Sequence, residues 1–176
     1  MMTNFKEKLQ HIRAFIFDVD GVLTDGSLIL MPDGEQIRTM NIKDGYAMQL
    51  AIKAGFQMAI ISGRKSEGVI KRLQKLGIFN LYLGVDDKTE ALDEFMLTYQ
   101  IEKDQILYMG DDIPDLEVMK KIGTPTCPKD AVEEIKQISH YVSPLKGGKG
   151  CARDVIEQVM RVQGLWPYGI EKEPNL

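Results

Sequence analysis

The strongest constraint on the fold is an alternation of short apolar runs with longer amphipathic segments. The apolar runs that we predict as buried strands lie at 14–18, 57–61, 80–84, 106–110 and 124–127. The segments that we predict as helices lie at 46–54, 67–76, 88–100, 115–122 and 131–138. Gly55 and Gly77 stand where two of these helices would end. The alternation predicts an α/β fold, a Rossmann-like parallel sheet with helices on both faces.

Residues 27–42 interrupt this alternation. Two β-prone runs there flank Pro32, Asp33 and Gly34, a combination typical of a hairpin turn. We therefore expect a β-hairpin inserted after the first strand. The gaps between the predicted strands leave no room for a separate cap domain. We expect one domain over residues 1–176, with a core at about 12–165 and a C-terminal tail at 166–176.

Charge and cysteine content narrow the class of protein. The 22 basic and 26 acidic residues give a net charge of -4, which argues against nucleic acid or an anionic membrane as a partner. No apolar run approaches the length of a membrane span, and the first residues do not resemble a signal peptide. Cys127 and Cys151 can form no disulfide framework and lie in no metal-binding spacing. We expect a cytoplasmic protein.

Functional side chains follow four of the predicted strands. Ligands of an open parallel sheet bind beyond the carboxyl ends of its strands. The residues at these positions are Asp18 and Asp20, then Ser62, Gly63 and Arg64, then Lys88, and finally Asp111, Asp112 and Asp115. Each group alone also fits a solvated turn, a helix cap or a surface charge. Together they predict a site that gathers carboxylates, a hydroxyl and a cation at one rim.

The run that ends in Asp18 and Asp20 poses the sharpest question. Side chains two residues apart in extended backbone point to the same side, so both carboxylates can converge. Carboxylates at the end of an apolar strand are unfavourable unless something compensates their charge. Either the turn is solvated or the acids hold a cation, and Gly21 permits a sharp turn in both cases.

The motifs carry a family resemblance. The stretches "DVDGVLTD", "IISGR", Lys88 and "GDDIPD" resemble the four-part signature of the haloacid dehalogenase-like phosphohydrolases. Over about 12–165 the chain is similar to the capless 3-deoxy-D-manno-octulosonate 8-phosphate phosphatases, through "NIKDGYAMQLA", "LGVDDKTEAL" and "GGKGCARDV". The resemblance implies a Mg²⁺-dependent phosphoric monoester hydrolase that releases the free sugar acid and phosphate in lipopolysaccharide sugar synthesis.

The resemblance also implies a role for each residue of the signature. Asp18 would attack phosphorus to form an aspartyl-phosphate, and Asp20 would serve as general acid and base. Ser62 and Lys88 would hold the phosphoryl oxygens. The implied Mg²⁺ ligands are Asp18, Asp111 and the backbone carbonyl of Asp20.

The residues that bind the sugar part of the substrate are predicted less directly. Arg64 is suited to clamp the carboxylate of a sugar acid. The further candidates for substrate binding are Gly63, Lys43, Lys149 and Arg153. The segment 145–150 resembles the family's glycine-rich segment, which is thought to enter the active site; a flexible connection to the last helix is the alternative. Asp25, Asp112 and Asp115 are left without a single assigned role, and for Asp25 an ordering role in the loop is favoured.

A capless site needs another cover. The resemblance implies a homotetramer in which the hairpins of neighbouring subunits roof the site. Ile29, Leu30, Ile37 and Met40 would then include interface residues. The alternative is that the hairpin packs only on its own core.

Three other functions remain as alternatives. Cys151 and Asp154 stand where we expect Ala and Glu, so a nine-carbon, sialic-acid-like keto-deoxy sugar acid 9-phosphate is an alternative substrate. A receiver-type signalling module also uses acids, a lysine and Mg²⁺, but its phosphoacceptor follows a middle strand, whereas Asp18 follows the first. A catalytically idle interaction protein fits poorly with the complete signature.

Overall fold

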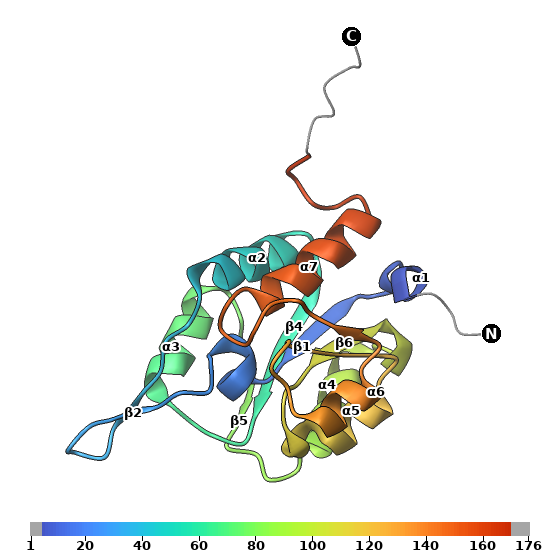
Figure 1. Ribbon diagram of the computed structural model, residues 1–176. Coiled ribbons are helices and arrows are strands. Elements are labelled where there is room, and N and C mark those ends of the chain that lie inside the picture. The colour runs from blue at the N-terminus through green and yellow to red at the C-terminus, as the bar shows by residue number, and fades with distance from the viewer. Residues whose placement is uncertain (1–4, 170–176) are drawn as a thin grey trace.

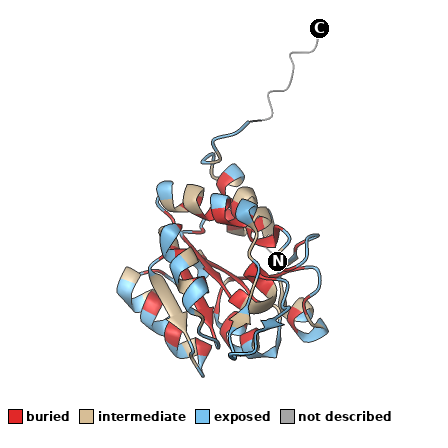
Figure 2. Ribbon diagram, turned by 90° about the vertical axis from the view of Figure 1, so that its left-hand side faces the viewer, coloured by how far each residue is buried: buried red, intermediate tan, exposed pale blue. Residues whose placement is uncertain are grey.

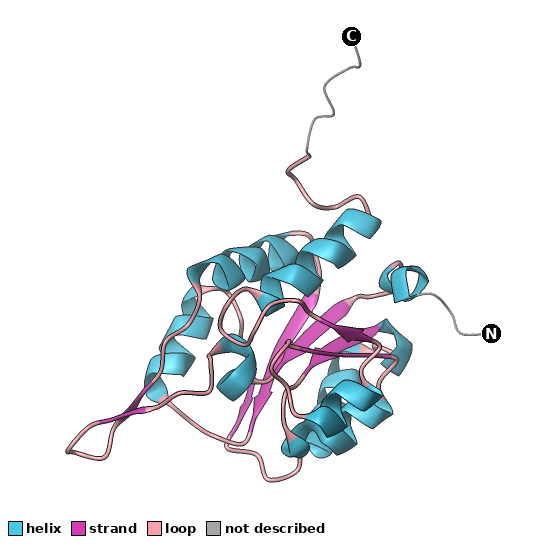
Figure 3. Ribbon diagram, viewed as in Figure 1, coloured by secondary structure: helices cyan, strands magenta, loops and turns pink. Residues whose placement is uncertain are grey.

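The computed structural model describes residues 5–169 and is built around one six-stranded parallel sheet (Figures 1 and 3). In spatial order the strands are β5 (Asn80–Leu83), β4 (Gln57–Ser62), β1 (Ala14–Phe17), β6 (Ile106–Met109), β7 (Thr124–Cys127) and β8 (Tyr141–Val142). Every neighbouring pair in this sheet is parallel. The predicted α/β fold is confirmed.

Helices cover both faces of the sheet. Successive side chains of a strand point to opposite sides, and here both sides are apolar, so each face packs against helices. Phe15 and Phe17 pack on one face and Ala14 and Ile16 on the other. The first face is covered by α1 (Phe5–Leu9), α2 (Ile42–Lys53), α3 (Glu67–Lys75) and α7 (Cys151–Val162). The second is covered by α4 (Lys88–Tyr99), α5 (Leu116–Lys121) and α6 (Glu133–Ile138). The central strands are therefore buried along their length (Figure 2).

The predicted hairpin is present and projects from the body of the molecule (Figure 1). Its strands β2 (Ile29–Leu30) and β3 (Gln36–Ile37) are antiparallel, with Ile29 opposite Ile37. Between Asp18 and Gly63 the chain forms a kinked turn at Val19–Leu23, this hairpin, α2 and β4. No separate cap domain is inserted in this described segment, as expected.

The bounds of some elements differ from the predicted ones for local reasons. α2 begins before residue 46, because the Asn41 side chain caps it by accepting a hydrogen bond of 2.8 Å from the Lys43 amide. Gly55 and Gly77 have φ of +95° and +89°, which confirms them as helix-ending glycines. Strand β8 is not predicted from the sequence, since two residues carry no periodicity.

The order of the strands creates a crevice. From β1 the chain moves outward through β4 and β5, then returns to β6 on the other side of β1 and continues to β7 and β8. Open α/β sheets bind ligands where the strand order reverses in this way. Asp18 directly follows β1 and Asp111 follows β6 after one glycine, so these two carboxylates flank the crevice.

The glycine-rich segment before α7 packs against the loop after β1. The Gly148 amide donates a hydrogen bond of 2.9 Å to the Val22 carbonyl. A Cβ atom on Gly147 would overlap the carbonyl oxygen of Gly21, so this close approach excludes any side chain. The segment therefore supports the loop that carries Asp20. Within residues 5–169, no helix is long and apolar enough to cross a membrane.

Candidate active site

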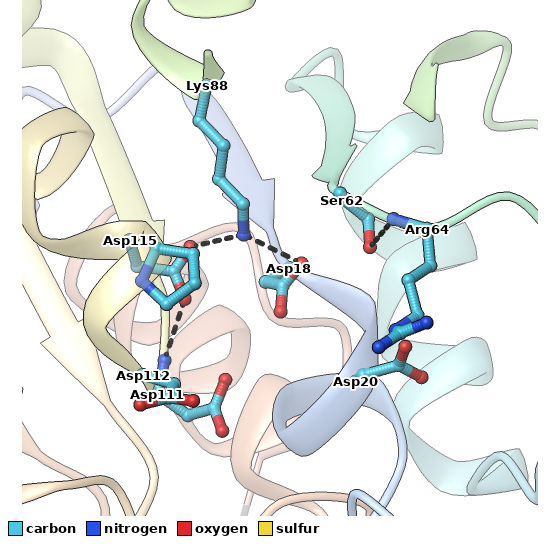
Figure 4. Close-up of a pocket in the computed structure, with 10 residues that line it drawn as sticks. Asp18, Asp20, Ser62, Arg64, Lys88, Asp111, Asp112 and Asp115 are labelled. Carbon is cyan, nitrogen blue, oxygen red and sulfur yellow. Dashed lines mark hydrogen bonds and ion pairs between the residues drawn. The ribbon is translucent and has the colours of Figure 1, made fainter. Parts of the chain in front are cut away.

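A cavity of about 510 Å³ opens at the carboxyl ends of the strands (Figure 4). Its lining comprises Asp18, Asp20, Ser62, Gly63, Arg64, Lys88, Asp111, Asp112, Pro114 and Asp115. The structure thus brings together all the residues that the sequence analysis assigns to catalysis or to the metal, along with two of the five predicted substrate-binding residues.

The ammonium of Lys88 lies between two buried carboxylates. Lys88 is the first residue of α4, and its Nζ atom lies 3.0 Å from Asp18 Oδ1 and 2.7 Å from Asp115 Oδ1. All three side chains are less than a tenth exposed. From this position after β5 the lysine side chain points toward Asp18, which follows β1 at the same edge of the sheet (Figure 4).

Asp115 has both carboxylate oxygens engaged within the protein. Oδ1 accepts hydrogen bonds from Lys88 Nζ and from the Tyr108 hydroxyl, at 2.7 and 2.8 Å. Oδ2 accepts one from the Asp111 amide at 3.1 Å. The residue therefore holds Lys88 and the loop after β6 in place. Tyr108 is missed by the sequence analysis, because it lies inside an apolar strand and gives no polar signal.

Asp18 and Asp111 could hold a divalent cation. Ligand atoms of Asp18, Asp111 and Asp115 lie within 4.8 Å of one another. Asp111 Oδ1 is buried and accepts no hydrogen bond from residues 5–169, whereas the Asp115 oxygens are already used. A Cβ atom on Gly21, whose φ is +96°, would overlap the Asp111 carboxylate, so glycine is required there. Hard oxygen ligands that leave room for water suit Mg²⁺.

The acids of the cavity repel one another. Burial, followed by the charge of Asp115, raises the pKa of Asp18 to about 6, although Lys88 opposes the rise. Burial, followed by the charges of Asp18 and Asp115, raises the pKa of Asp111 to about 8. Burial lowers the pKa of Lys88, but Asp18 and Asp115 outweigh it and raise that pKa above its usual value. A cation bound here would relieve the repulsion.

Asp20 lies in the turn after Asp18 and is paired with an arginine of the hairpin. Arg38 Nε lies 2.6 Å from Asp20 Oδ1 and Arg38 Nη2 lies 3.2 Å from Oδ2. The Arg38 side chain is 5% exposed and that of Asp20 is 25% exposed. Arg38 is also missed by the sequence analysis, because an arginine in a hairpin resembles any solvated charge.

The loop after β4 supplies the other wall of the cavity. Ser62 ends this strand with its side chain directed into the cavity, and it is 2% exposed. The Arg64 amide donates a long hydrogen bond of 3.5 Å to Ser62 Oγ. Arg64 is exposed and extends from this loop along the cavity toward the side where Asp20 lies (Figure 4). A hydroxyl and an exposed guanidinium are thus available to an anionic ligand.

Three predicted substrate-binding residues do not line the cavity of their own chain. Lys43 is exposed in the first turn of α2. Arg153 on α7 donates to Glu157 at 3.2 Å and lies 5.3 Å from the centre of the Trp166 ring. Lys149 pairs with Asp25 at 3.5 Å on the outside of the loop after β1.

The glycine-rich segment 145–150 does not line the cavity either. It lies behind the loop after β1, where Gly147 meets Gly21 and the Gly147 amide donates to Asp130 Oδ1 at 2.9 Å. Asp25 accepts a hydrogen bond of 3.0 Å from the Ser27 amide, an arrangement that orders the loop. The part of the predicted tail at 170–176 lies outside the described residues.

Comparison with known proteins identifies the family of the chain. A family model described as haloacid dehalogenase-like hydrolase matches residues 79–153, which include Lys88 and Asp111. The 3-deoxy-D-manno-octulosonate 8-phosphate phosphatase KdsC of Yersinia pestis is 36% identical over 157 residues. That match covers 89% of this chain and 84% of the relative.

Solved structures give the same result. A probable YrbI family phosphatase from Pseudomonas syringae is 38% identical, with a TM-score of 0.89 and coverage of 92% of each chain. The 3-deoxy-D-manno-octulosonate 8-phosphate phosphatase of Moraxella catarrhalis, solved with a magnesium ion, a phosphate ion and a KDO molecule, is 34% identical. Its TM-score is 0.89, and the match covers 93% of this chain and 94% of that one. The chain therefore belongs to the 3-deoxy-D-manno-octulosonate 8-phosphate phosphatases of the haloacid dehalogenase-like hydrolases.

Proposed function

We propose that this protein is a Mg²⁺-dependent phosphatase that hydrolyses 3-deoxy-D-manno-octulosonate 8-phosphate to the free sugar acid and phosphate. The observation that carries the proposal is the contact of 3.0 Å between Lys88 and Asp18 in a cavity that also presents Ser62. These groups lie at the point where the strand order reverses. The family of the chain supplies the substrate.

Phosphoryl transfer begins at Asp18. One of its carboxylate oxygens attacks phosphorus, the bond from phosphorus to the sugar oxygen breaks, and an aspartyl-phosphate forms. Lys88 and the Ser62 hydroxyl hold the phosphoryl oxygens as negative charge spreads over them. Mg²⁺, held by Asp18, Asp111 and the backbone carbonyl of Asp20, would supply charge neutralisation and orient the phosphate.

Asp20 moves the proton in both half-reactions. Its carboxyl group donates a proton to the sugar oxygen as that oxygen leaves. The resulting carboxylate then accepts a proton from the water that attacks the aspartyl-phosphate. This water releases inorganic phosphate and restores Asp18. Asp20 lines the cavity and is partly exposed, as a group that meets both substrate and water must be.

Arg64 is the residue that we assign to the sugar carboxylate, with Gly63 beside it. Arg64 is exposed at the cavity rim, and its guanidinium can meet a carboxylate with two parallel hydrogen bonds. Lys43, Lys149 and Arg153 also remain proposed contacts. Because they lie outside the cavity of their own chain, they would have to reach the cavity of a neighbouring subunit.

A homotetramer would complete this open site. The hairpin exposes Ile29 at 56% and Leu30 at 71%, an apolar surface that suits burial against another copy of the chain. We propose that hairpins of neighbouring subunits cover the cavity and exclude water. Each subunit is then one catalytic domain with its core at about 12–165. The free, buried thiols of Cys127 and Cys151 suit the reducing cytoplasm, where we place the enzyme.

The test is kcat/KM with Mg²⁺ for octulosonate 8-phosphate beside the nine-carbon keto-deoxy sugar acid 9-phosphate. A large preference for the eight-carbon ester supports the proposal. A preference for the nine-carbon ester keeps the mechanism and replaces the substrate. Absence of metal-dependent phosphate release from both esters overturns the proposal.

A further inference from the structure

The hairpin reaches into the catalytic machinery through one side chain. Arg38, directly after β3, makes a two-point contact with Asp20 across 18 residues of sequence. We propose that Arg38 is a positioning residue that fixes the orientation of the Asp20 carboxyl group for proton transfer. This inference rests on the proposed function, because that function makes Asp20 the general acid and base.

The geometry of the contact restricts Asp20 strongly. Arg38 Nε meets Oδ1 and Nη2 meets Oδ2, so the planar guanidinium aligns the whole carboxyl group and a rotation would break both bonds. The arginine is itself anchored, since its Nη1 donates to the Gln36 carbonyl at 3.1 Å. Because the Arg38 guanidinium is held by the Gln36 carbonyl, it can in turn hold the Asp20 carboxylate in one orientation.

Arg38 acts through Asp20 and not on the substrate. It is absent from the lining of the active-site cavity, and its side chain is 5% exposed. It lines a separate cavity of about 330 Å³ between the hairpin and α3, to which Arg72 also contributes. Within residues 5–169, Arg38 donates both hydrogen bonds that the Asp20 carboxylate accepts from side chains. Asp20 itself has a non-helical backbone conformation inside the turn at Val19–Leu23, and loss of Arg38 would remove both of these hydrogen bonds from its carboxylate.

The consequence for catalysis depends on the leaving group. An alkyl oxygen of a sugar leaves poorly and needs the Asp20 proton as its bond to phosphorus breaks, whereas a nitrophenolate leaves without that help. Misplacement of a catalytic group by about 1 Å can cost roughly a hundredfold in rate. Loss of Arg38 should therefore slow cleavage of the sugar ester much more than cleavage of an aryl ester.

The experiment compares Arg38→Met, Arg38→Lys and the wild type on octulosonate 8-phosphate and 4-nitrophenyl phosphate, with saturating Mg²⁺. For Arg38→Met we expect kcat/KM to fall roughly 10- to 100-fold on the sugar ester and by less than about threefold on the aryl ester. Arg38→Lys, which keeps the charge but offers a single point of contact, should recover part of the loss. The matched control is Arg72→Met, which removes an arginine of the same neighbouring cavity that does not touch Asp20.

A double mutant separates positioning from a merely structural role. In an Asp20→Asn background, Arg38→Met should cause little further loss on the sugar ester, because the group that it positions is already disabled. Equal losses on both esters, or fully additive losses in the double mutant, overturn the proposal. If Arg38→Met does not fold, Arg38→Lys decides the question through the same comparison of esters.

Failure of the proposed function would look different. A wild-type protein that hydrolyses neither ester overturns the phosphatase, while the link between Arg38 and Asp20 is then measured by the same double-mutant cycle in thermal unfolding. If the two substitutions change Tm independently in that cycle, Arg38 and Asp20 are not coupled and the proposal is refuted.

Discussion

The Lys88 ammonium lies 2.7 Å from Asp115 Oδ1, in a place where the two side chains are 6% and 1% exposed. This pair joins the start of α4 to the short helical turn at Ile113–Asp115 after β6. It holds the ammonium beside Asp18, whose Oδ1 atom lies 3.0 Å from Lys88 Nζ. Asp115 is thus placed to hold Lys88 in position beside Asp18.

Replacement of Asp115 should expose this supporting role. With saturating Mg²⁺, we expect Asp115→Asn to lower the free energy of unfolding by on the order of 3 kcal/mol, because a buried ion pair loses one partner. Without Mg²⁺ the loss should be smaller, because the Asp115 charge then also repels Asp18 and Asp111. Urea unfolding measures both values. The control is Asp112→Asn, an exposed neighbour, and an equal effect of both variants would contradict this role.

Asp18→Asn should abolish turnover of every phosphate ester while the fold is retained. The amide cannot attack phosphorus, and burial already disfavours the charge that the variant removes. Phosphate release and thermal unfolding measure the two effects. Retention of substantial turnover with both a sugar ester and an aryl ester would refute the assignment of the nucleophile.

The metal-free protein should lose stability as pH rises. The pKa of Asp111 is raised from 3.8 to about 8, so its contribution to stability is complete below about pH 4 and is lost as pH passes through about 8. Asp18 adds the same trend through about pH 6. Mg²⁺ binding requires the ionised carboxylates, so the rise in Tm on adding Mg²⁺ should grow with pH.

Asp111→Asn supplies the comparison for this pH dependence. Relative to wild type in the absence of metal, the variant should become progressively more stable as pH increases, and its Tm should respond weakly to Mg²⁺. Asp112→Asn should follow the wild type. If the Tm of the metal-free wild type instead rises relative to that of Asp111→Asn over this range, the carboxylates do not destabilise the protein by mutual repulsion, and the explanation is refuted.

Arg64→Ala should separate recognition of the sugar acid from chemistry. A charge-assisted contact to a carboxylate is worth about 1.5–3 kcal/mol, so kcat/KM for the sugar ester should fall roughly 10- to 100-fold. For 4-nitrophenyl phosphate, which has no carboxylate, the change should be much smaller. Lys71→Ala, an exposed charge on α3, is the control. Equal losses on the two esters would move Arg64 from substrate selection to general catalysis.

A charge in the hairpin should disrupt the proposed tetramer. Leu30→Asp places a carboxylate in the exposed apolar strand β2, where burial against another subunit would be unfavourable. We expect smaller assemblies by light scattering and lower activity at the same protein concentration. The control is Leu97→Asp, which makes the same substitution at a leucine that is 81% exposed on α4 and should leave the assembly unchanged. An unaltered mass for Leu30→Asp would place the interface elsewhere.

The periodicity of the sequence predicts most of the sheet because its strands are buried on both faces and read as apolar runs. The site follows from the same logic: Asp18, Ser62, Lys88 and Asp111 come after different strands, and parallel strands end at one edge. Neither the strands nor these four residues depend on one specific long-range contact to be predicted. Strand β8 is not predicted in this way, because a two-residue strand at the edge of the sheet forms only through its pairing with β7.

Two residues that sequence reasoning misses, and the packing of the glycine-rich segment, depend on contacts that only the folded chain makes. Arg38 contacts Asp20 from the hairpin and Tyr108 contacts Asp115 from an apolar strand, and neither residue belongs to a motif that would mark it in the sequence. Lys149 lies in a glycine-rich stretch that suggests mobility, yet Gly147 and Gly148 pack their backbone against Gly21 and Val22. Such a fit is visible only when both segments are folded.

This backbone contact has a consequence for synthesis of the protein on the ribosome. The loop after β1 is translated well before Gly147 and Gly148, against which it packs. In a nascent chain that already contains Asp18, Ser62, Lys88 and Asp111, the loop after β1 would still lack its contact with Gly147 and Gly148 until the segment before α7 is translated. Full activity should therefore appear only after Gly147, Gly148 and α7 have been translated.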